Sequence, residues 1–329
     1  MQRLEAQVRE CYEEASDLDS KEIVEMMVYD ACFIVQLIRF DFVGDIFKER
    51  GIRDEILNDL QLLENQLPFF VLSELYHIIA PEEDVHQLAH HAISYFRNCS
   101  LFHLFEDDLL PNKEIKHLLH LLLAARQWNC MHLALTASES TSQGKMKFIG
   151  NATELDDAGI NFLGATLEKM KDPKPGIETE FDIMFTKDTK VLMIPTLSVD
   201  DWTERRFRNC IAFEQFIPYG KPTYFSDYVI FMDTLIDTSK DVQLLRKHEI
   251  IDNCLGDDEA VAQMFNRLMD SVCWTDDFYY AEIFERVNKH CQKRRNRWKA
   301  LLKKKYFNSH ISFFAATVLL LLTIFSLLS

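Results

Sequence analysis

The histidines of the N-terminal half come nearest to a metal site by residue type and spacing. His86 and His90 stand four positions apart, so both imidazoles would lie on one face of a helix. Such a pair binds a transition metal when a cysteine or carboxylate completes the coordination. No such residue stands at a recognised ligand spacing from this pair. We therefore predict hydrogen-bonded or solvent-exposed histidines, with no metal ion and no other cofactor.

Two short strings imitate functional motifs, but each lacks the residue that its chemistry requires. Gly159 and Gly164 have the glycine spacing of a phosphate-binding loop, yet Ala165 stands where a lysine would meet the phosphates. The string His248-Glu249-Ile-Ile-Asp252 begins like a zinc-protease helix, yet the second histidine is absent. Neither string predicts an active site.

Pairs of adjacent aspartates are the remaining candidates for acid–base chemistry. Adjacent residues on a helix do not face each other, and several pairs precede predicted helices, where carboxylates cap the first turn. We therefore expect capping roles. The pairs are Asp107-Asp108, Asp156-Asp157, Asp200-Asp201, Asp257-Asp258 and Asp276-Asp277.

No string in the sequence indicates a nucleophile, because neither a serine elbow nor a Cys–His pairing is visible. The sequence therefore predicts no catalytic residue and a protein that is not an enzyme. A membrane-bound hydrolase or metal-dependent enzyme, assembled from residues distant in sequence, stays an alternative.

The elements that hold these residues are predicted to be mostly helices. The chain has 329 residues, 48% of them apolar, with only 9 Gly and 8 Pro, which allows a sizeable core and disfavours a glycine-rich nucleotide fold. The stretch Ala31–Ile38 is apolar nearly all round, which predicts a helix buried in the body. Periodicity and breakers place helices at Arg3–Ala15, about Lys21–Phe40, Arg53–Asn65, Phe69–Ile79, Glu82–Asn98, Lys113–Trp128, Thr203–Phe216, Ser226–Ser239, Asp241–His248, Asp257–Val272 and Asp277–Phe307.

The predicted fold class is mainly α (α+β), a helical body with a small antiparallel β insertion near residues 160–194 and a C-terminal transmembrane helix. Strands are expected at Ile160–Glu168, Ile177–Thr186 and Val191–Ile194. The expected parts are an N-terminal helical region (1–135), a linker or mobile loop (136–150), the β insertion plus helices packed on the same body (151–277), a basic juxtamembrane helix (278–307) and the transmembrane helix (311–328).

The C-terminal stretch Ile311–Leu328 predicts a transmembrane helix, because it contains no charged residue, no Pro and no Gly. At about 1.5 Å per residue its 18 residues would span about 27 Å, close to the hydrocarbon thickness of a thin bilayer. The segment ends one residue before the end of the sequence, so we expect a single-pass tail anchor.

A basic run precedes this segment and predicts binding to an anionic membrane surface. Its bases are Lys293, Arg294, Arg295, Arg297, Lys299, Lys303, Lys304 and Lys305. Tyr306 and Phe307 follow where interfacial aromatic residues are expected. Bases that flank a membrane helix stay cytoplasmic, so we expect a cytosolic body at the plasma membrane or an endomembrane.

The net charge of −16 is divided unevenly along the chain. Residues 286–329 carry ten basic and no acidic residues, so the preceding 285 residues hold all 52 acidic residues and the other 26 basic ones. Such an acidic body repels nucleic-acid backbones and anionic leaflets. The expected partners are the lipid bilayer and an unknown protein, with no nucleic acid.

The cysteines agree with a cytosolic body. Eight of them are scattered singly with no CxxC, as is usual for reduced thiols. The opposite topology stays open, and it predicts disulfides together with glycosylation at Asn98 and Asn151, the two sequon asparagines.

Several strings together match a known family in its order over nearly the whole chain. They are Tyr29–Ile38, Leu62–Leu72, Ala152–Ile160, Ile194–Asp201, Phe207–Gln215, Asp227–Asp258, Val287-Asn288 and Asn296–Trp298, followed by the apolar tail. The strings Glu64-Asn-Gln-Leu-Pro68 and Ala212-Phe-Glu-Gln215 are specific. In these residues the sequence resembles the plant family known as domain of unknown function 247.

The resemblance implies a land-plant protein with one C-terminal membrane helix, no established enzymatic activity and no catalytic residues to carry over. Some grass members are implicated as pollen-side determinants of self-incompatibility, which makes recognition an alternative role. Members usually begin with a further stretch bearing Ile-Gly-Pro-x-His-His, whereas Met1 here opens inside what resembles a later helix, so we expect a shortened form or gene model. The predicted function is a membrane-anchored interaction or signalling component.

Overall fold

The computed structural model describes residues 2–12, 17–40, 50–96, 115–125, 147–165, 181–216, 223–270, 272–273 and 278–293. The chain divides into two compact units. Unit 1 comprises Met1–Ser138 with Asp201–Lys221, and unit 2 comprises Glu139–Asp200 with Pro222–Ser329. The predicted region 151–277 therefore contains a segment, 201–221, that belongs with the N-terminal helices.

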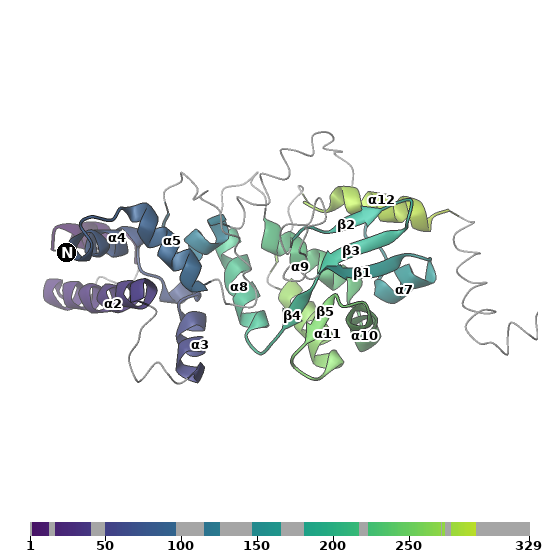
Figure 1. The fold of residues 1–329 in the computed structure, drawn as a ribbon, viewed down its shortest axis with the longest axis horizontal. Coiled ribbons are helices and arrows are strands. Elements are labelled where there is room, and N and C mark those ends of the chain that lie inside the picture. Colours follow the sequence, from purple (N-terminus) through teal and green to yellow (C-terminus); the bar gives the residue numbers. More distant parts are fainter. Residues whose placement is uncertain are drawn as a thin grey trace, which may run out of the picture. The chain divides into compact units, whose positions relative to one another are not determined.

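Unit 1 is built from helices (Figure 1). Pro68 precedes α4 and fixes an extended backbone just before it, so this helix begins and ends where the sequence predicts. The elements are η1 (Gln2–Leu4), α1 (Glu5–Arg9), α2 (Ser20–Phe40), α3 (Arg50–Asp59), η4 (Leu63–Asn65), α4 (Phe69–Ile79), α5 (Val85–Phe96), a helix over 118–125 and α8 (Thr203–Glu214).

The long helix α2 organises the core of unit 1 by packing against α4 and α5. A capping box begins it, because Asp19 Oδ1 accepts from the N–H groups of Lys21 and Glu22 at 2.8 Å while Glu22 Oε2 accepts from the Asp19 N–H at 3.0 Å. The prediction that Ala31–Ile38 lies buried in the body is wrong for one face, since the Phe33 side chain is 41% exposed. The apolar pattern alone does not show which of these side chains stays exposed.

Unit 2 contains a three-stranded mixed sheet in the order β1-β3-β2. Its strands are β1 (Asn161–Ala165), β2 (Met184–Thr186) and β3 (Val191–Pro195). The β2–β3 hairpin is antiparallel, but β1 runs parallel to β3, so the prediction of an antiparallel insertion is wrong for this pair. The 25 residues between β1 and β3 leave room for the crossover that parallel pairing requires.

A second pairing, which the sequence did not predict, continues from the first sheet. Beyond Thr196 the chain forms β4 (Leu197–Val199), which pairs in parallel with β5 (Ile251–Asn253). The N–H groups of Gly164 and Leu197 donate to the carbonyls of His248 and Ile250 at 2.8 Å, so the segment before β5 lies against both β1 and β4.

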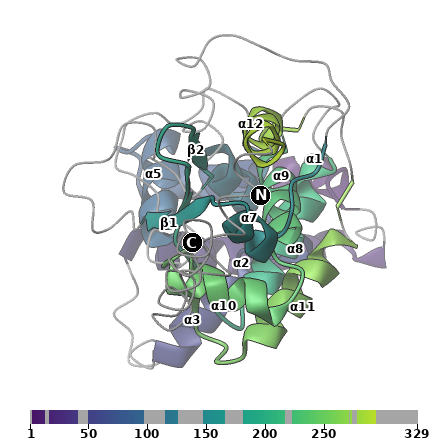
Figure 2. The same ribbon diagram turned by 90° about the vertical axis from the view of Figure 1, so that its right-hand side faces the viewer.

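Helices cover both sides of these strands in unit 2. Helix α12 packs on β2, and α10 and α11 lie together on the opposite side of the strands (Figures 1 and 2). The apolar α9 packs against α11 and buries every residue from Tyr224 to Met232. The helices are α7 (Ala152–Asp157), α9 (Tyr224–Leu235), α10 (Ser239–Lys247), α11 (Asp258–Met269) and α12 (Ala281–Cys291).

The predicted helix Asp277–Phe307 is shorter in the part that the structure describes. Helix α12 ends at Cys291, and Gln292 and Lys293 follow it outside the helix. The predicted transmembrane segment 311–328 lies outside the described residues. Within the described ranges, no helix is both long and apolar enough to cross a membrane.

Candidate functional site

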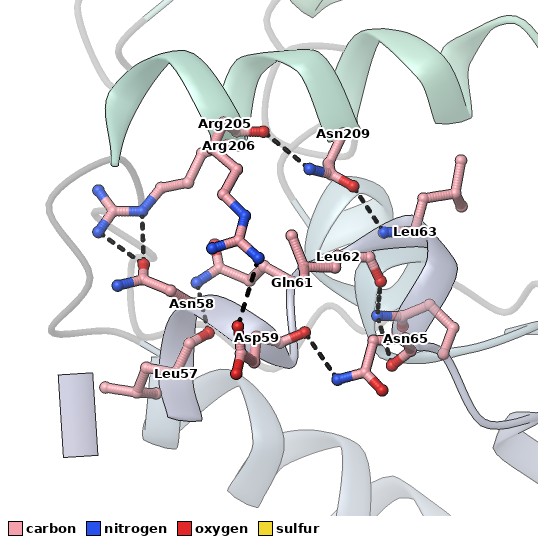
Figure 3. Close-up of polar contacts among 11 residues, drawn as sticks. Leu57, Asn58, Asp59, Gln61, Leu62, Leu63, Asn65, Arg205, Arg206 and Asn209 are labelled. Carbon is pink, nitrogen blue, oxygen red and sulfur yellow. Dashed lines mark hydrogen bonds and ion pairs between the residues drawn. The ribbon is translucent and has the colours of Figure 1, made fainter. Parts of the chain in front are cut away.

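A buried polar seam in unit 1 joins α8 to the end of α3 (Figure 3). The guanidinium of Arg206 donates from Nε at 3.0 Å and from a terminal nitrogen at 2.9 Å to Asn58 Oδ1. Both side chains are buried. Beside them, the Asp59 carboxylate meets the Arg205 guanidinium at 3.5 Å. Hydrogen bonds from a charged donor are stronger than neutral ones, so the Arg206–Asn58 pair stabilises the contact between α8 and α3.

The same seam closes the turn after α3 through Asn209 and Gln66. Asn209 Oδ1 accepts from the Leu63 N–H at 2.7 Å. The Gln66 amide donates to the carbonyls of Leu60 and Leu62 at 2.8 and 2.7 Å, and its Oε1 accepts from the Leu119 N–H at 2.9 Å. These side chains hold the backbone of the turn, which is a structural role.

Two histidines cap the helix over 118–125 in place of the usual serine or aspartate. His117 Nδ1 accepts from the His120 N–H at 3.2 Å, and His120 Nδ1 accepts from the Lys116 N–H at 3.1 Å. The His117 ring meets Phe213 edge-on with centroids 5.1 Å apart. Burial, with the charges of His120 and Lys116, lowers the pKa of His117 to about 4. This role was not predicted from the sequence, although two histidines three residues apart at a helix start are a recognisable signal.

The histidine pair and the glycine string considered as functional motifs lie at an exposed helix face and at tight backbone positions. His86 and His90 lie exposed on α5, and the described residues contain no group of three or more side chains suited to a metal ion. Gly159 ends α7 with a φ of +82°. A Cβ at Gly164 would collide with the Glu249 carbonyl group.

The zinc-protease-like string is not helical along its length. Helix α10 ends at Lys247, with His248 as its C-cap, and Glu249 adopts a φ of +59°. His248 and Glu249 therefore do not lie on one helical turn, as the first two residues of a zinc-protease helix would need to.

The aspartate pairs divide between capping and other positions. Asp257 Oδ1 accepts from the Glu259 N–H at 3.0 Å and caps α11, which confirms the predicted role for this pair. Asp156 and Asp157 are the last residues of α7, so capping its first turn is wrong for them. Asp201 precedes α8, whose N-cap Trp202 makes no side-chain cap hydrogen bond. The pairs at 107–108 and 276–277 lie outside the described residues.

Asp241 is a buried carboxylate that the sequence analysis did not single out. Its Oδ1 accepts from the N–H of Thr153 at 2.9 Å and from the Thr153 hydroxyl, and its Oδ2 accepts from the N–H and hydroxyl of Thr238 at 2.9 and 3.0 Å. Burial acts to raise the pKa of Asp241, but these hydrogen bonds outweigh it and leave the pKa below its ordinary value. The carboxylate caps α10 and ties it to α7.

One face of α2 in unit 1 is apolar and exposed. Met26, Tyr29 and Phe33 lie on one side of the helix at spacings of three and four residues, with exposed fractions of 39%, 70% and 41%. Acidic residues flank this face, which we call the α2 stripe. The exposed acids beside it are Glu22, Glu25 and Asp30.

The residues predicted at the membrane lie at the end of α12 and beyond. Lys293 is exposed two residues after the helix, whereas the bases from Arg294 to Lys305, Tyr306 and Phe307 lie outside the described residues. Of the two sequon asparagines, Asn98 also lies outside them. Asn151 caps α7 by accepting from the Glu154 N–H at 2.9 Å.

Comparison with known proteins assigns the chain to a family. The model of the plant family known as domain of unknown function 247, described as "Plant protein of unknown function", matches residues 1–325. The chain belongs to this family. A relative from Arabidopsis thaliana, UPF0481 protein At3g47200, is 27% identical over 99% of this chain and 70% of its own length. Another, Putative UPF0481 protein At3g02645, is 22% identical over 98% of this chain and 77% of its own length. No solved structure matches the chain.

The structure gives a physical reason for the two family strings singled out in the sequence. In this domain of unknown function 247 protein, Glu64–Pro68 and Ala212–Gln215 both belong to unit 1. Gln66 of the first string holds the turn after α3, and Phe213 of the second packs against His117. Both strings therefore contribute to the helical scaffold of unit 1.

Proposed function

We propose that this protein is a membrane-tethered interaction component that acts by binding a partner protein rather than by catalysis. The apolar segment 311–328 and the basic run before it support the tether, and the flanking bases support a cytosolic body at the plasma membrane or an endomembrane. The structural positions of Gly159, Gly164 and Asp257 support a non-catalytic reading of those motifs.

The α2 stripe is the observation that carries the interaction. An exposed Tyr flanked by Met and Phe at helical spacing has the composition of an interface centre, where aromatic residues and Met are enriched. Helices α4 and α5 already pack against α2 in the core of unit 1, so the stripe would add an interface without rearranging the fold.

The charges beside the stripe select the partner. Glu22, Glu25 and Asp30 would attract lysine or arginine side chains at the rim of an interface. They would repel a second copy of the same face, which disfavours a symmetric dimer through α2. We infer that the partner presents an amphipathic helix, apolar on one side and basic at its flanks, in a helix-to-helix contact.

The test compares matched variants of the full chain in detergent. Tyr29→Ser/Phe33→Ser removes the aromatic residues of the stripe, and Ile78→Ser, at an equally exposed apolar residue of α4, is the control. The probes are two synthetic amphipathic helices with a leucine face, one flanked by lysines and the other by glutamates. We expect the lysine peptide to bind, and to bind about 30-fold more weakly to the double variant, because two aromatic contacts of about 1 kcal/mol each are lost.

Each outcome decides between surfaces. Equal binding of the two peptides, or equal loss in the Ile78→Ser control, would overturn the stripe as a charge-selective site. Self-association that the double variant abolishes would assign the stripe to a second copy instead. In plant cells, proximity labelling from an N-terminal fusion should recover a partner that is lost with the double variant, and the purified pair must then bind directly.

The tether is tested separately by deleting residues 311–329. We expect the deletion to move the protein from the membrane fraction to the soluble fraction without changing peptide binding. Unchanged fractionation would overturn the tether and leave the α2 stripe standing.

A further inference from the structure

We propose that the β2–β3 turn of unit 2 and the end of α12 form a basic surface that binds anionic lipid headgroups beside the tether. We call this surface the lysine shoulder, and it consists of Lys187, Lys190 and Lys293. The inference rests on the proposed membrane tether and extends it. The sequence predicted lipid contact only for the run that follows α12, whereas the structure adds a turn more than a hundred residues away in the sequence.

His290 shows that the two parts of the shoulder lie together. This side chain is buried in the last turn of α12, with its ring 6.1 Å from that of Phe185 on β2. Burial lowers the pKa of His290, and the charges of Lys190 and Lys293 lower it further. The geometry agrees: the Lys293 N–H donates to the His290 carbonyl at 3.2 Å, and α12 packs on β2, the strand that leads into the turn with Lys187 and Lys190.

The β2–β3 turn carries two of the three lysines. Lys187 follows the last residue of β2, and Lys190 precedes the first residue of β3 with a φ of +58°. That backbone conformation favours glycine, so the chain keeps a lysine at a position where it is strained. Lys187 and Lys293 are exposed and Lys190 is half-buried.

The lysines of the shoulder are available to an external anion. Among the described residues, none of the three forms an ion pair with a carboxylate, whereas Lys289 on α12 is paired with Glu285 at 2.5 Å. The opposing charge in the turn is Asp188. Asp156 and Asp157 end α7, just before Ala158, whose carbonyl accepts from His290.

The sequence that follows Lys293 is strongly basic. Seven further bases and no acid follow between residues 294 and 305, and the apolar segment begins at Ile311. Bases near an anionic leaflet are drawn to it. The rest of the body is acidic and is repelled, so the shoulder is the side of unit 2 that would meet the leaflet.

The experiment is lysine footprinting of the full chain in nanodiscs. The chain is incorporated into discs of phosphatidylcholine alone or of phosphatidylcholine with phosphatidylserine, and exposed amines are acetylated and located by mass spectrometry. The readout is the rate at which Lys187 and Lys190 are acetylated. Lys293 is left out because it belongs to the basic run, which is expected to contact the membrane in any case. Lys240 and Lys247 are the matched controls, since they belong to α10, on the opposite side of the strands (Figure 2).

We expect acetylation of Lys187 and Lys190 to be about fivefold slower in the anionic discs, from the usual contribution of one base near an anionic leaflet. High salt should remove the difference because it screens the attraction. The Lys190→Gly variant suits the backbone and removes one charge, so it should reduce the protection of Lys187. The control variant Lys240→Ser should leave the protection of Lys187 unchanged.

The possible results separate the shoulder from the tether. Incorporation with equal labelling of Lys187 and Lys190 in both kinds of disc would overturn the shoulder alone. Equal protection of Lys240 and Lys247 would also overturn it, because the effect would then be general. A chain that does not incorporate through residues 311–328 would overturn the tether, and the shoulder with it.

Discussion

Asn209 Oδ1 accepts a hydrogen bond from the Leu63 N–H at 2.7 Å, so a side chain of α8 closes the turn that follows α3. Residues 146 positions apart thereby become neighbours in unit 1. A partly buried N–H that loses its acceptor costs about 1–2 kcal/mol.

Asn209→Ala should therefore destabilise unit 1 by that amount, measured from urea unfolding followed by hydrogen exchange of amides in α3 and α8. Asn209→Asp keeps the acceptor and should recover most of the loss. Asn65→Ala, at an exposed side chain of the same turn, is the control and should have a smaller effect. Equal losses in the two alanine variants would show that the Leu63 contact contributes little.

The Thr153 hydroxyl donates to the Asp241 carboxylate and links α7 to α10 in unit 2. Thr153→Val removes this donor and keeps the side-chain shape, so it should destabilise unit 2 by about 1.5–3 kcal/mol, the usual range for a hydrogen bond to a charged group. Thr153→Ser retains the hydroxyl and should recover most of the stability. Thermal unfolding measures the difference, and a serine variant as unstable as the valine variant would assign the effect to packing.

Asp241 also makes the stability of unit 2 depend on pH. Its folded pKa lies below the ordinary value of an aspartate, so the unfolded chain binds a proton at a higher pH than the folded chain does. The stability from this group is present above the unfolded pKa of about 3.9 and is lost as the pH falls through the folded pKa. Asp241→Asn should flatten the stability profile below about pH 4, whereas Asp156→Asn, at an exposed residue of α7, should leave it unchanged.

Several elements could be predicted because local signals define them. Pro68 and a continuous apolar pattern mark α4, and a capping box marks the start of α2. The strands β1 and β2 fall within the predicted ranges, and β3 begins at the predicted residue and ends one residue later, at Pro195. In these places, the residues that form an element also carry the signal for its ends.

Other features depend on neighbours that are distant in sequence. Strands β4 and β5 have three residues each and pair across more than fifty positions, so neither has a periodicity that predicts its partner. Strand β1 pairs in parallel with β3 on the side opposite β2, and the turn residues alone specify neither that side nor that direction. The seam of Asn58 and Arg206 is likewise a tertiary contact between two helices, each of which looks ordinary by itself.

The stability of unit 1 is also expected to depend on pH, through His117. Its pKa falls from 6.5 to about 4, mainly because the ring is buried. Between these values the unfolded chain binds a proton that the folded chain does not, so stability decreases as the pH falls from 6.5 toward 4 and is constant above 6.5. His117→Asn keeps a capping acceptor and removes the titration, and should reduce the slope of the urea midpoint against pH. His86→Asn, at an exposed histidine of α5, should not change that slope.

Gly164 is predicted to tolerate no side chain. A Cβ at this position would collide with the Glu249 carbonyl and lie 2.7 Å from the His248 carbonyl oxygen, both of which are backbone groups held in place by hydrogen bonds. Gly164→Ala should therefore disrupt the packing of β1 against the segment before β5 and prevent unit 2 from folding. Gly51→Ala is the contrasting variant, because this glycine lies in α3 with open space around it. It should stabilise unit 1 by about 0.5–1 kcal/mol, and circular dichroism melting measures both changes.

The topology of the body can be tested through its two sequons. Asn151 and Thr153 of the second sequon both serve the fold, since Asn151 caps α7 and Thr153 bonds to Asp241. We expect an N-terminally tagged full chain in plant microsomes to be digested by added protease and to carry no sugar at Asn98 or Asn151, because the basic run should keep the body in the cytosol. A glycosylase-sensitive, protease-protected body would contradict this topology. It would place the α2 stripe and the lysine shoulder on the far side of the membrane, and it would direct the search for a partner to extracellular or lumenal proteins. An Asn98→Gln/Asn151→Gln variant distinguishes the two cases, since its electrophoretic mobility changes only if the body is glycosylated.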